Sequence, residues 1–182
     1  AGHWGTEVTL GVNLLQSYYT RNWHGGDKGS VVWNATLDAA AQKNLGESWH
    51  WLNTANLAFG QNYQQERDPD GSLYWKKPDK TTDQIKAESL LRYLRSALNP
   101  YASVRFESQF LDQTDLYGRD LSLNPLEFFE SVGVSRMLID TEARKFLVRL
   151  GFTIHQSARD LYLNAPPDDA LESVTAGDGG AE

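Results

Sequence analysis

The chain has 182 residues, enough for one domain, and its formal net charge of −7 argues against nucleic acid as a partner. It has no cysteine, which excludes disulfides, and no run of eighteen apolar residues, which excludes a transmembrane helix but not a membrane barrel made of strands. Aromatic residues make up 12% of the chain, and Tyr and Trp suit a surface that is apolar on one side and wet on the other.

Alternation of apolar and polar residues recurs along the chain and predicts strands with one apolar and one polar face. The runs cover residues 8–14, 31–42, 49–60, 85–93, 102–110, 131–138 and 145–155. A helix over Gln84 to Leu98 is the competing interpretation, because this segment is rich in Lys, Glu, Leu and Arg. We favour a strand there, because the neighbouring runs are strands and the link to the next run is tight.

The connections between the runs alternate in length. Tight links at residues 44–47, 96–100 and 140–143 alternate with long polar stretches at 24–30, 66–80 and 112–125. Outer-membrane barrels have short periplasmic turns at one end and longer loops at the other. The sequence therefore predicts an all-β fold: an antiparallel up-and-down meander of about seven or more long strands, forming a transmembrane β-barrel or part of one.

The last part of the chain has a different composition. Residues 165–182 are rich in Pro, Asp and Gly, which predicts a loop or disordered tail after a barrel domain at residues 1–164. Barrels made of one bacterial chain usually have an even number of strands. Because we count about seven, we expect the barrel domain in this chain to be incomplete.

Alternation alone does not decide which face is buried, because a soluble barrel turns its apolar face inward and a membrane barrel turns it toward lipid. Three observations favour lipid. The runs exceed the about 5–6 residues usual in soluble strands, the two kinds of connection never exchange ends, and aromatic residues gather near the ends of runs. The predicted membrane-interface aromatics are Tyr18, Tyr19, Trp23, Trp49, Trp51, Tyr63 and Trp75.

On the membrane interpretation, the charged residues of the polar face line a lumen. The candidates are Lys86, Glu88, Arg92, Arg105, Glu107, Lys145, Arg149 and His155. They either line a wet channel or form a structural network of ion pairs, and we favour the network. Like charges directly opposite each other are destabilising, so we expect Arg92 to face Glu107 rather than Arg105. Glu130 and Arg136 fall on the apolar face, toward the strand ends, where a charge facing lipid costs little.

Other motifs predict turns rather than chemistry. Residues 22–27 and 68–72 have turn composition, and the latter lacks the acidic residue that would complete an EF-hand calcium loop. Lys80 and Asp83 can form an ion pair at the start of a strand. No pair of histidines has metal-ligand spacing, so we expect neither metal nor cofactor. His155 and Ser157 share a face, but Asp160 would not, which argues against a catalytic triad.

Several motifs together resemble an uncharacterised family of bacterial outer-membrane barrels, a domain of unknown function. Asn22-Trp23 with Gly25-Gly26 resembles its Asn-Trp-x-x-Gly-Gly start, and Trp49 to Asn53, followed by Gly60, resembles its next hairpin. Lys80 to Asp83 is similar to its Lys-x-x-Asp element. Phe106 to Phe110 is similar to its Phe-x-x-Gln-Phe strand, and Asn124-Pro125 lies where that family has a loop containing proline. The resemblance implies an outer-membrane barrel and supplies no catalytic residue.

From these observations we expect a bacterial outer-membrane β-barrel that is not an enzyme and acts as a passive channel or envelope scaffold. Its partners would be the lipid bilayer and other envelope proteins. The alternative is a soluble, lipocalin-like barrel that binds a small apolar ligand. An outer-membrane lipid hydrolase is the least favoured hypothesis.

Overall fold

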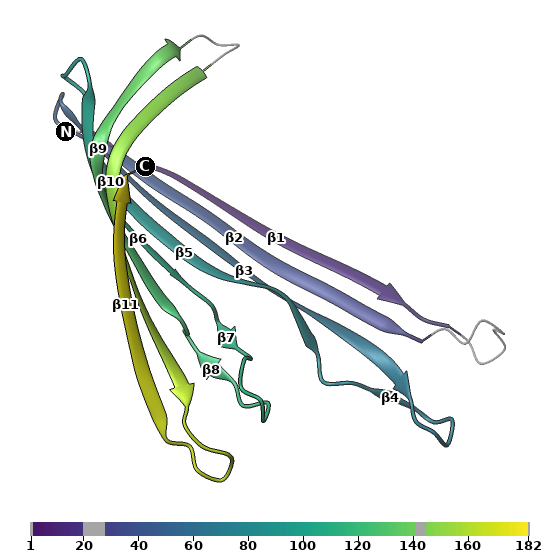
Figure 1. The fold of residues 1–182 in the computed structure, drawn as a ribbon. Coiled ribbons are helices and arrows are strands. Elements are labelled where there is room, and N and C mark those ends of the chain that lie inside the picture. Colours follow the sequence, from purple (N-terminus) through teal and green to yellow (C-terminus); the bar gives the residue numbers. More distant parts are fainter. Residues whose placement is uncertain (1, 20–27, 141–144, 182) are drawn as a thin grey trace.

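A computed structural model gives the fold of residues 2–19, 28–140 and 145–181 (Figure 1). The strands are Gly5–Ser17 (β1), Ser30–Leu45 (β2), Trp49–Arg67 (β3), Leu73–Trp75 (β4), Asp79–Tyr93 (β5), Asn99–Ser108 (β6), Leu111–Asp112 (β7), Leu121–Ser122 (β8), Leu126–Asp140 (β9), Lys145–Tyr162 (β10) and Leu171–Ala181 (β11). The eight long strands form one antiparallel meander in the order β1-β2-β3-β5-β6-β9-β10-β11, to which β4 adds beside β3, while β7 and β8 pair separately. No helix in the described residues is long and apolar enough to cross a membrane. The all-β meander predicted from alternation is confirmed, and Gln84 to Tyr93 is strand rather than helix.

The connections alternate in length as predicted. β2 joins β3 through residues 46–48, where Gly46 takes a φ of 67°, and β5 joins β6 through residues 94–98. Longer connections follow β3, β6 and β10 at the other end of the sheet. The third tight link (141–144) and residues 20–27 of the first long loop lie outside the described residues. The sheet therefore has a tight-turn end, with the connections at residues 46–48 and 94–98, and a long-loop end, with the connections after β3, β6 and β10.

The tail is where the fold departs most from the sequence prediction. Residues 171–181, expected to be loop or disordered, form strand β11, which pairs with β10 from Tyr162↔Leu171 to Phe152↔Ala181. The Gly-rich composition of this segment hides a strand, because its backbone hydrogen bonds to β10 need no apolar side chains. The long connection after β10 therefore has a returning strand.

The pairing between β5 and β6 also differs from the expected register. Arg92 lies opposite Tyr101, while Lys86 lies opposite Glu107 and Glu88 opposite Arg105. The prediction that Arg92 faces Glu107 is therefore wrong. The turn is centred near Ser96, and Asn99 already belongs to β6, so the two strands meet several residues earlier than expected. This register still places opposite charges across from each other, at two positions instead of one.

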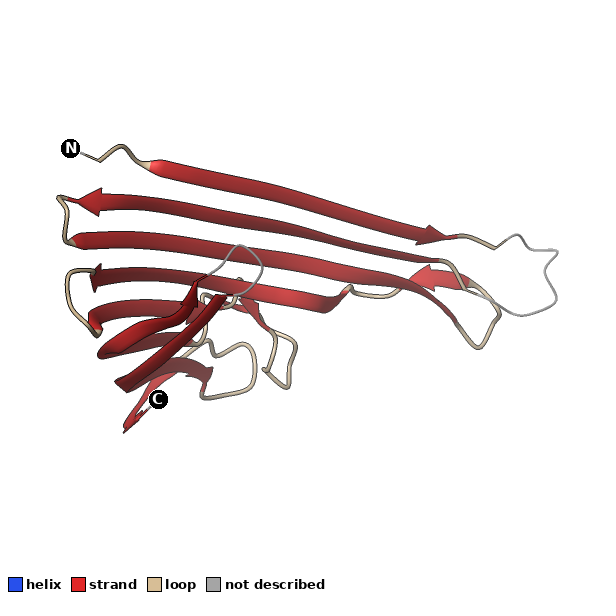
Figure 2. Ribbon diagram, turned by 90° about the horizontal axis from the view of Figure 1, so that it is seen from above, coloured by secondary structure: helices blue, strands red, loops and turns tan. Residues whose placement is uncertain are grey.

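The sheet is open between its edge strands β1 and β11, and no helix formed by the described residues covers either face (Figures 1 and 2). The predicted barrel is thus not closed by the described strands. Leu90 and Tyr101 are the only buried hydrophobic residues among the described side chains. The described part of the chain consequently has no hydrophobic core between two layers, which is the arrangement that soluble domains use to bury an apolar face.

The apolar face of the sheet is more exposed than the polar face, which is the reverse of what a soluble domain shows. In β9 and β10, the apolar-face residues Val132 and Leu150 are 59% and 65% exposed. On the polar face of the same strands, Ser135 and Thr153 are 2% and 7% exposed. Side chains on the polar face therefore cover one another, whereas those on the apolar face point into open space.

Candidate functional site

The polar face carries a continuous chain of charge and aromatic contacts across five strands. Lys86 Nζ and Arg105 Nε lie 3.2 Å and 3.0 Å from the same oxygen of Glu107. The Arg105 guanidinium lies 4.2 Å from the centre of the Phe129 ring, and that ring stacks on His155 at 4.4 Å. His155 Nδ1 in turn lies 3.3 Å from Asp178 Oδ1 on β11. These contacts join β5, β6, β9, β10 and β11 into one wall.

Of the eight predicted lumen residues, seven lie on this face by register. Four of them (Lys86, Arg105, Glu107 and His155) take part in the contacts above. Glu88 lies opposite Arg105, and Arg92 and Arg149 lie nearer the tight-turn end. Lys145 belongs to β10, but its side chain is outside the described residues. Sequence reasoning missed Phe129 and Asp178, because their roles depend on which strands pair.

A tyrosine packs over paired glycines near the tight-turn end of the polar face. Tyr101 lies opposite Gly133, and Gly133 lies opposite Gly151. A Cβ atom added at Gly151 would lie 2.6 Å from the Tyr101 hydroxyl, so a side chain there would collide with the ring. The ring is buried, and the guanidinium of Arg149 lies 5.8 Å from its centre. The small residues thus make room for one aromatic anchor across three strands.

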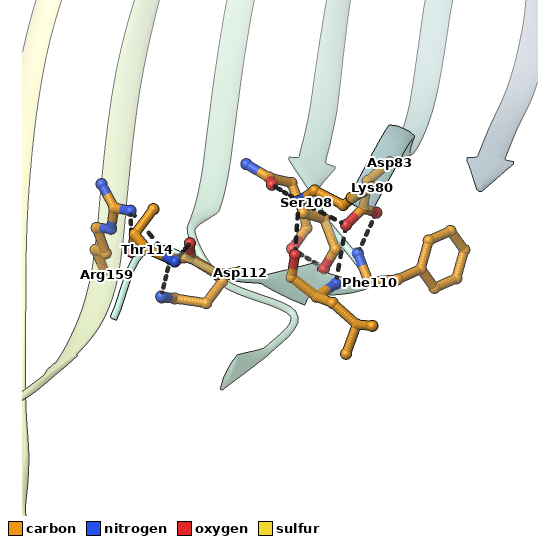
Figure 3. Close-up of polar contacts among 10 residues, drawn as sticks. Lys80, Asp83, Ser108, Phe110, Asp112, Thr114 and Arg159 are labelled. Carbon is orange, nitrogen blue, oxygen red and sulfur yellow. Dashed lines mark hydrogen bonds and ion pairs between the residues drawn. The ribbon is translucent and has the colours of Figure 1, made fainter. Parts of the chain in front are cut away.

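At the long-loop end, a buried carboxylate holds the junction between β5 and the segment after β6 (Figure 3). Asp83 accepts hydrogen bonds from the backbone N–H groups of Phe110 and Leu111 at 2.6 Å and 3.0 Å. Its Oδ2 also lies 3.0 Å from Lys80 Nζ, which confirms the predicted ion pair. Lys80 further donates to the side chain of Gln109 and to the carbonyl of Leu111. The Lys-x-x-Asp and Phe-x-x-Gln-Phe motifs therefore meet in space.

A second buried carboxylate ties the excursion of β7 and β8 to β10 (Figure 3). Asp112 Oδ2 accepts from Asn124 Nδ2 at 2.7 Å and from Arg159 Nη2 at 3.0 Å. Asn124 also accepts from the backbone N–H of Asp160 at 2.8 Å and donates to its carbonyl at 2.9 Å. Both carboxylate oxygens of Asp112 and the side-chain amide of Asn124 therefore have hydrogen-bond partners, and these bonds fix the loop. We read the node as structural.

A third node joins two long loops around Arg119. Its guanidinium binds both oxygens of Asp115 at 3.1 Å, and it donates to the carbonyls of Asn164 and Asp168 at 2.7 Å and 2.8 Å. It also lies 3.7 Å from the centre of the Tyr162 ring. The hydrogen bonds from Arg119 lower the pKa of the Asp115 carboxyl and raise the pKa of the guanidinium. A hollow of about 320 Å³ lies beside this node.

The predicted interface aromatics lie at both ends of the sheet. Trp49 and Trp51 begin β3 at the tight-turn end, where Trp49 packs edge-on against Tyr93 at 5.0 Å and the Trp51 indole N–H donates to Ser89 at 2.9 Å. The members at the long-loop end are Tyr18, Tyr19, Tyr63 and Trp75. Trp23 lies outside the described residues.

The remaining motifs form local structure. Residues 68–72 make a turn in which Asp70 accepts from the Ser72 N–H at 2.9 Å, and this bond lowers the pKa of Asp70. No group of three or more His, Asp or Glu side chains in the described part of the chain could hold a metal ion. His155 contacts Asp178, and Asp160 hydrogen-bonds Ser173. These partners differ from those that a triad of His155, Ser157 and Asp160 would need.

The apolar face contains two charges. Glu130 lies opposite Val104 and Ile154, between Phe128 and Val132 along its strand, and so is well inside the apolar face rather than at its edge. Arg136 lies opposite Val148, nearer the tight-turn end. Each of the two charges lies four residues from an end of β9, so neither is nearer a strand end than the other.

Comparison with known proteins adds one match. A family model described as "Protein of unknown function (DUF3078)" matches residues 14–113, which include the Asp83 junction and the tight turns at 46–48 and 94–98. No curated protein and no solved structure matches the chain.

Proposed function

Because the chain belongs to the family of proteins of unknown function DUF3078, whose description names no activity, we propose its function from the sheet itself. The proposal is that the sheet is the wall of a β-barrel in a bacterial outer membrane, where it acts as a passive channel or an envelope scaffold. Lipid would cover the apolar face, and the polar face would line the lumen.

The exposed apolar face is the first support. Burying apolar surface is the main favourable contribution to folding, and soluble domains cover such a face with a second layer. Here Val8, Leu10, Val12 and Leu14 of β1 are all more than 60% exposed, and Val132 and Leu150 of β9 and β10 are likewise exposed. The apolar-face residues of β2, β3 and β5 between them are mostly half-buried. A lipid environment covers this face without any second layer of protein.

The main support for the proposal is the position of the apolar stretches on successive strands. They shift along the strand direction from one strand to the next, so that together they form a slanted apolar belt across the sheet. Val8 of β1 lies in the same cross-strand row as Gln156 of β10. On β1, the apolar residues of 8–14 extend from this row toward the long loops. On β10, the apolar residues of 146–154 all lie on its tight-turn side.

The size of the slant matches a membrane barrel. From β1 to β10, the middle of the apolar stretch shifts by about nine residues, which is ~30 Å along the strand direction. The six strand spacings between β1 and β10 measure ~29 Å across the strands. The apolar belt therefore crosses the strands at about 45°. Strands of transmembrane barrels tilt by about 35–45°, so a belt parallel to the membrane plane needs this slant.

Aromatic residues lie at both edges of this belt. Trp49 and Trp51 lie at its tight-turn side on β3, and Tyr63 lies at its long-loop side on the same strand. Tyr and Trp prefer the interface between lipid and water, because one part of the ring system is apolar and the other forms hydrogen bonds. On this orientation, the turn at 46–48 would be periplasmic and the loop nodes extracellular.

A soluble barrel that binds an apolar ligand is the second candidate, and a hollow on the apolar face favours it. This hollow has a volume of about 550 Å³, and Trp51, Leu91, Val132 and Phe152 are among the residues that line it. If the sheet closed with its apolar face inward, the hollow would be the ligand site. The slanted belt has no role in that arrangement, which is why we prefer the membrane wall.

Detergent dependence separates the two candidates. We expect the 182-residue chain to refold, by circular dichroism and size-exclusion chromatography, only with detergent micelles or lipid vesicles. Leu37→Arg, which places a charge on the apolar face, should then lower stability by about 2–4 kcal/mol, and Thr36→Arg on the polar face should be tolerated. A monodisperse, folded chain in plain buffer would contradict the membrane proposal and favour the soluble barrel.

A further inference from the structure

Charges on the polar face are segregated along the strands. Arg92 lies in the row of Tyr101 and Gly151, and Arg149 lies two residues nearer the tight-turn end. By register, every carboxylate that the structure describes on this face lies at least four residues nearer the long loops than Arg92. They include Glu7, Asp38, Glu88, Glu107, Glu127, Glu172 and Asp178. The part of the face around Tyr101 therefore carries positive charge.

These two arginines differ from the other cations of the polar face. Lys86 and Arg105 share Glu107, whereas neither Arg92 nor Arg149 forms an ion pair with the described part of the chain. The Nε atom of Arg92 is buried and has no hydrogen-bond partner among the described residues. Buried donors are normally satisfied, because leaving one unpaired costs about 1–3 kcal/mol. Arg92 lies opposite Tyr101, and Tyr101 lines a hollow on this face.

A hollow of about 150 Å³ lies beside Tyr101 on this face. Arg105 and Arg149 line it, together with the hydroxyl-bearing Ser103 and Ser131. Water occupies ~30 Å³ per molecule in the liquid, so the hollow has room for about five non-hydrogen atoms. That is the size of a phosphate or a small carboxylate. Glu88 is the only carboxylate among the described residues of its lining, and Arg105 lies directly opposite it.

We infer that this hollow, with Arg92 opposite Tyr101 on the neighbouring strand, binds small anions that carry a phosphate or carboxylate group. Guanidinium groups bind such anions through paired, charge-assisted hydrogen bonds, and hydroxyl groups add further donors. Lumens lined by Arg favour anions for the same reason. The inference depends on the proposed function only for the route by which a solute reaches the site, and the binding itself does not require a channel.

Inorganic phosphate is the probe for binding. Titrated by calorimetry into the refolded chain, it should bind the unmodified protein and should bind Arg92→Gln/Arg149→Gln about tenfold or more weakly, because two charged donors are lost. Arg136→Gln is the matched control, because Arg136 lies at a similar level on the opposite face. Equal phosphate affinity in the double variant and the control, or no binding to the unmodified chain, would overturn the inference. The single variants keep the test usable if the double variant does not refold.

Ion selectivity tests the same site in a membrane. In a planar bilayer under a KCl gradient, the reversal potential should show a preference for chloride, which the double variant loses and Arg136→Gln keeps. A conducting chain without this preference would contradict the anion site and leave the barrel proposal standing. If the chain folds without detergent and does not conduct, the barrel proposal fails, and the phosphate titration in buffer still decides the anion site.

Discussion

The long-loop end and the strand wall of this sheet are stabilised in different ways. At the long-loop end, Asp83, Asp112 and Arg119 each make several hydrogen bonds to partners within the chain. In the wall, the apolar face has no second layer among the described residues, and the buried Nε atom of Arg92 on the polar face has no hydrogen-bond partner among them. The comparison teaches that Asp83, Asp112 and Arg119 of the loop end find their partners within the chain, whereas the wall is suited to an environment that the chain does not supply.

The largest effect should come from the most buried carboxylate of the loop end. Asp83→Ala removes the acceptor for two backbone N–H groups and leaves Lys80 without its charged partner, so we expect a loss of about 3–5 kcal/mol in the free energy of unfolding. Denaturant titration of the refolded chain measures it. Asp79→Ala breaks the exposed pair with Lys76 and should cost at most about 1 kcal/mol. Equal losses would mean that the loop end is not internally held.

In the wall, the aromatic anchor is the position to change. Tyr101→Ala opens a void above Gly133 and Gly151, and we expect about 2–4 kcal/mol of destabilisation. Tyr101→Phe keeps the ring and should cost about 1 kcal/mol or less. The same denaturant titration separates the two variants. If the phenylalanine variant were as unstable as the alanine variant, packing over the glycines would not explain the burial of Tyr101.

The smallest effect is the pH dependence of the loop node at Arg119. The pKa of Asp115 is lowered by Arg119, so the contribution of the pair is fully present above the carboxyl's ordinary value near 3.8 and is lost as pH falls through the lower, folded pKa. The protection factors of amide exchange at Tyr117 and Arg119, whose N–H groups bond to Asp115, should therefore fall only in acid. Arg119→Gln should move this loss of protection to higher pH, and an unchanged profile of the protection factors would argue against the pair.

Sequence reasoning succeeds here where the information is periodic or local. The alternation around Leu150 identifies a strand and its two faces, and the spacing of Lys80 and Asp83 identifies an ion pair. It fails where the answer depends on strand pairing. The partner of Arg92 depends on where the turn near Ser96 is centred, and a shift of a few residues replaces Glu107 with Tyr101.

The same reason explains what the sequence missed in the polar face. Phe129, His155 and Asp178 belong to three strands, so their contacts are not visible as a motif. Strand β11 has the composition of a loop, and only its pairing with β10 makes it a strand. The glycines at 133 and 151 are a usable signal, because two small residues in adjacent runs leave space for a large one.

The central claim is that the slanted apolar belt lies in the plane of a membrane, and depth measurements test it most directly. The chain has no cysteine, so single cysteines can be labelled at Leu10, Leu150, Val8 and Gln156 and quenched by lipids that carry quenchers at known depths. We predict similar depths for Leu10 and Leu150, near the middle of the bilayer. Val8 and Gln156, which share one row, should differ in depth by ~20 Å because the strands tilt. Equal depths for Val8 and Gln156, or no quenching at any of the four positions, would contradict the account.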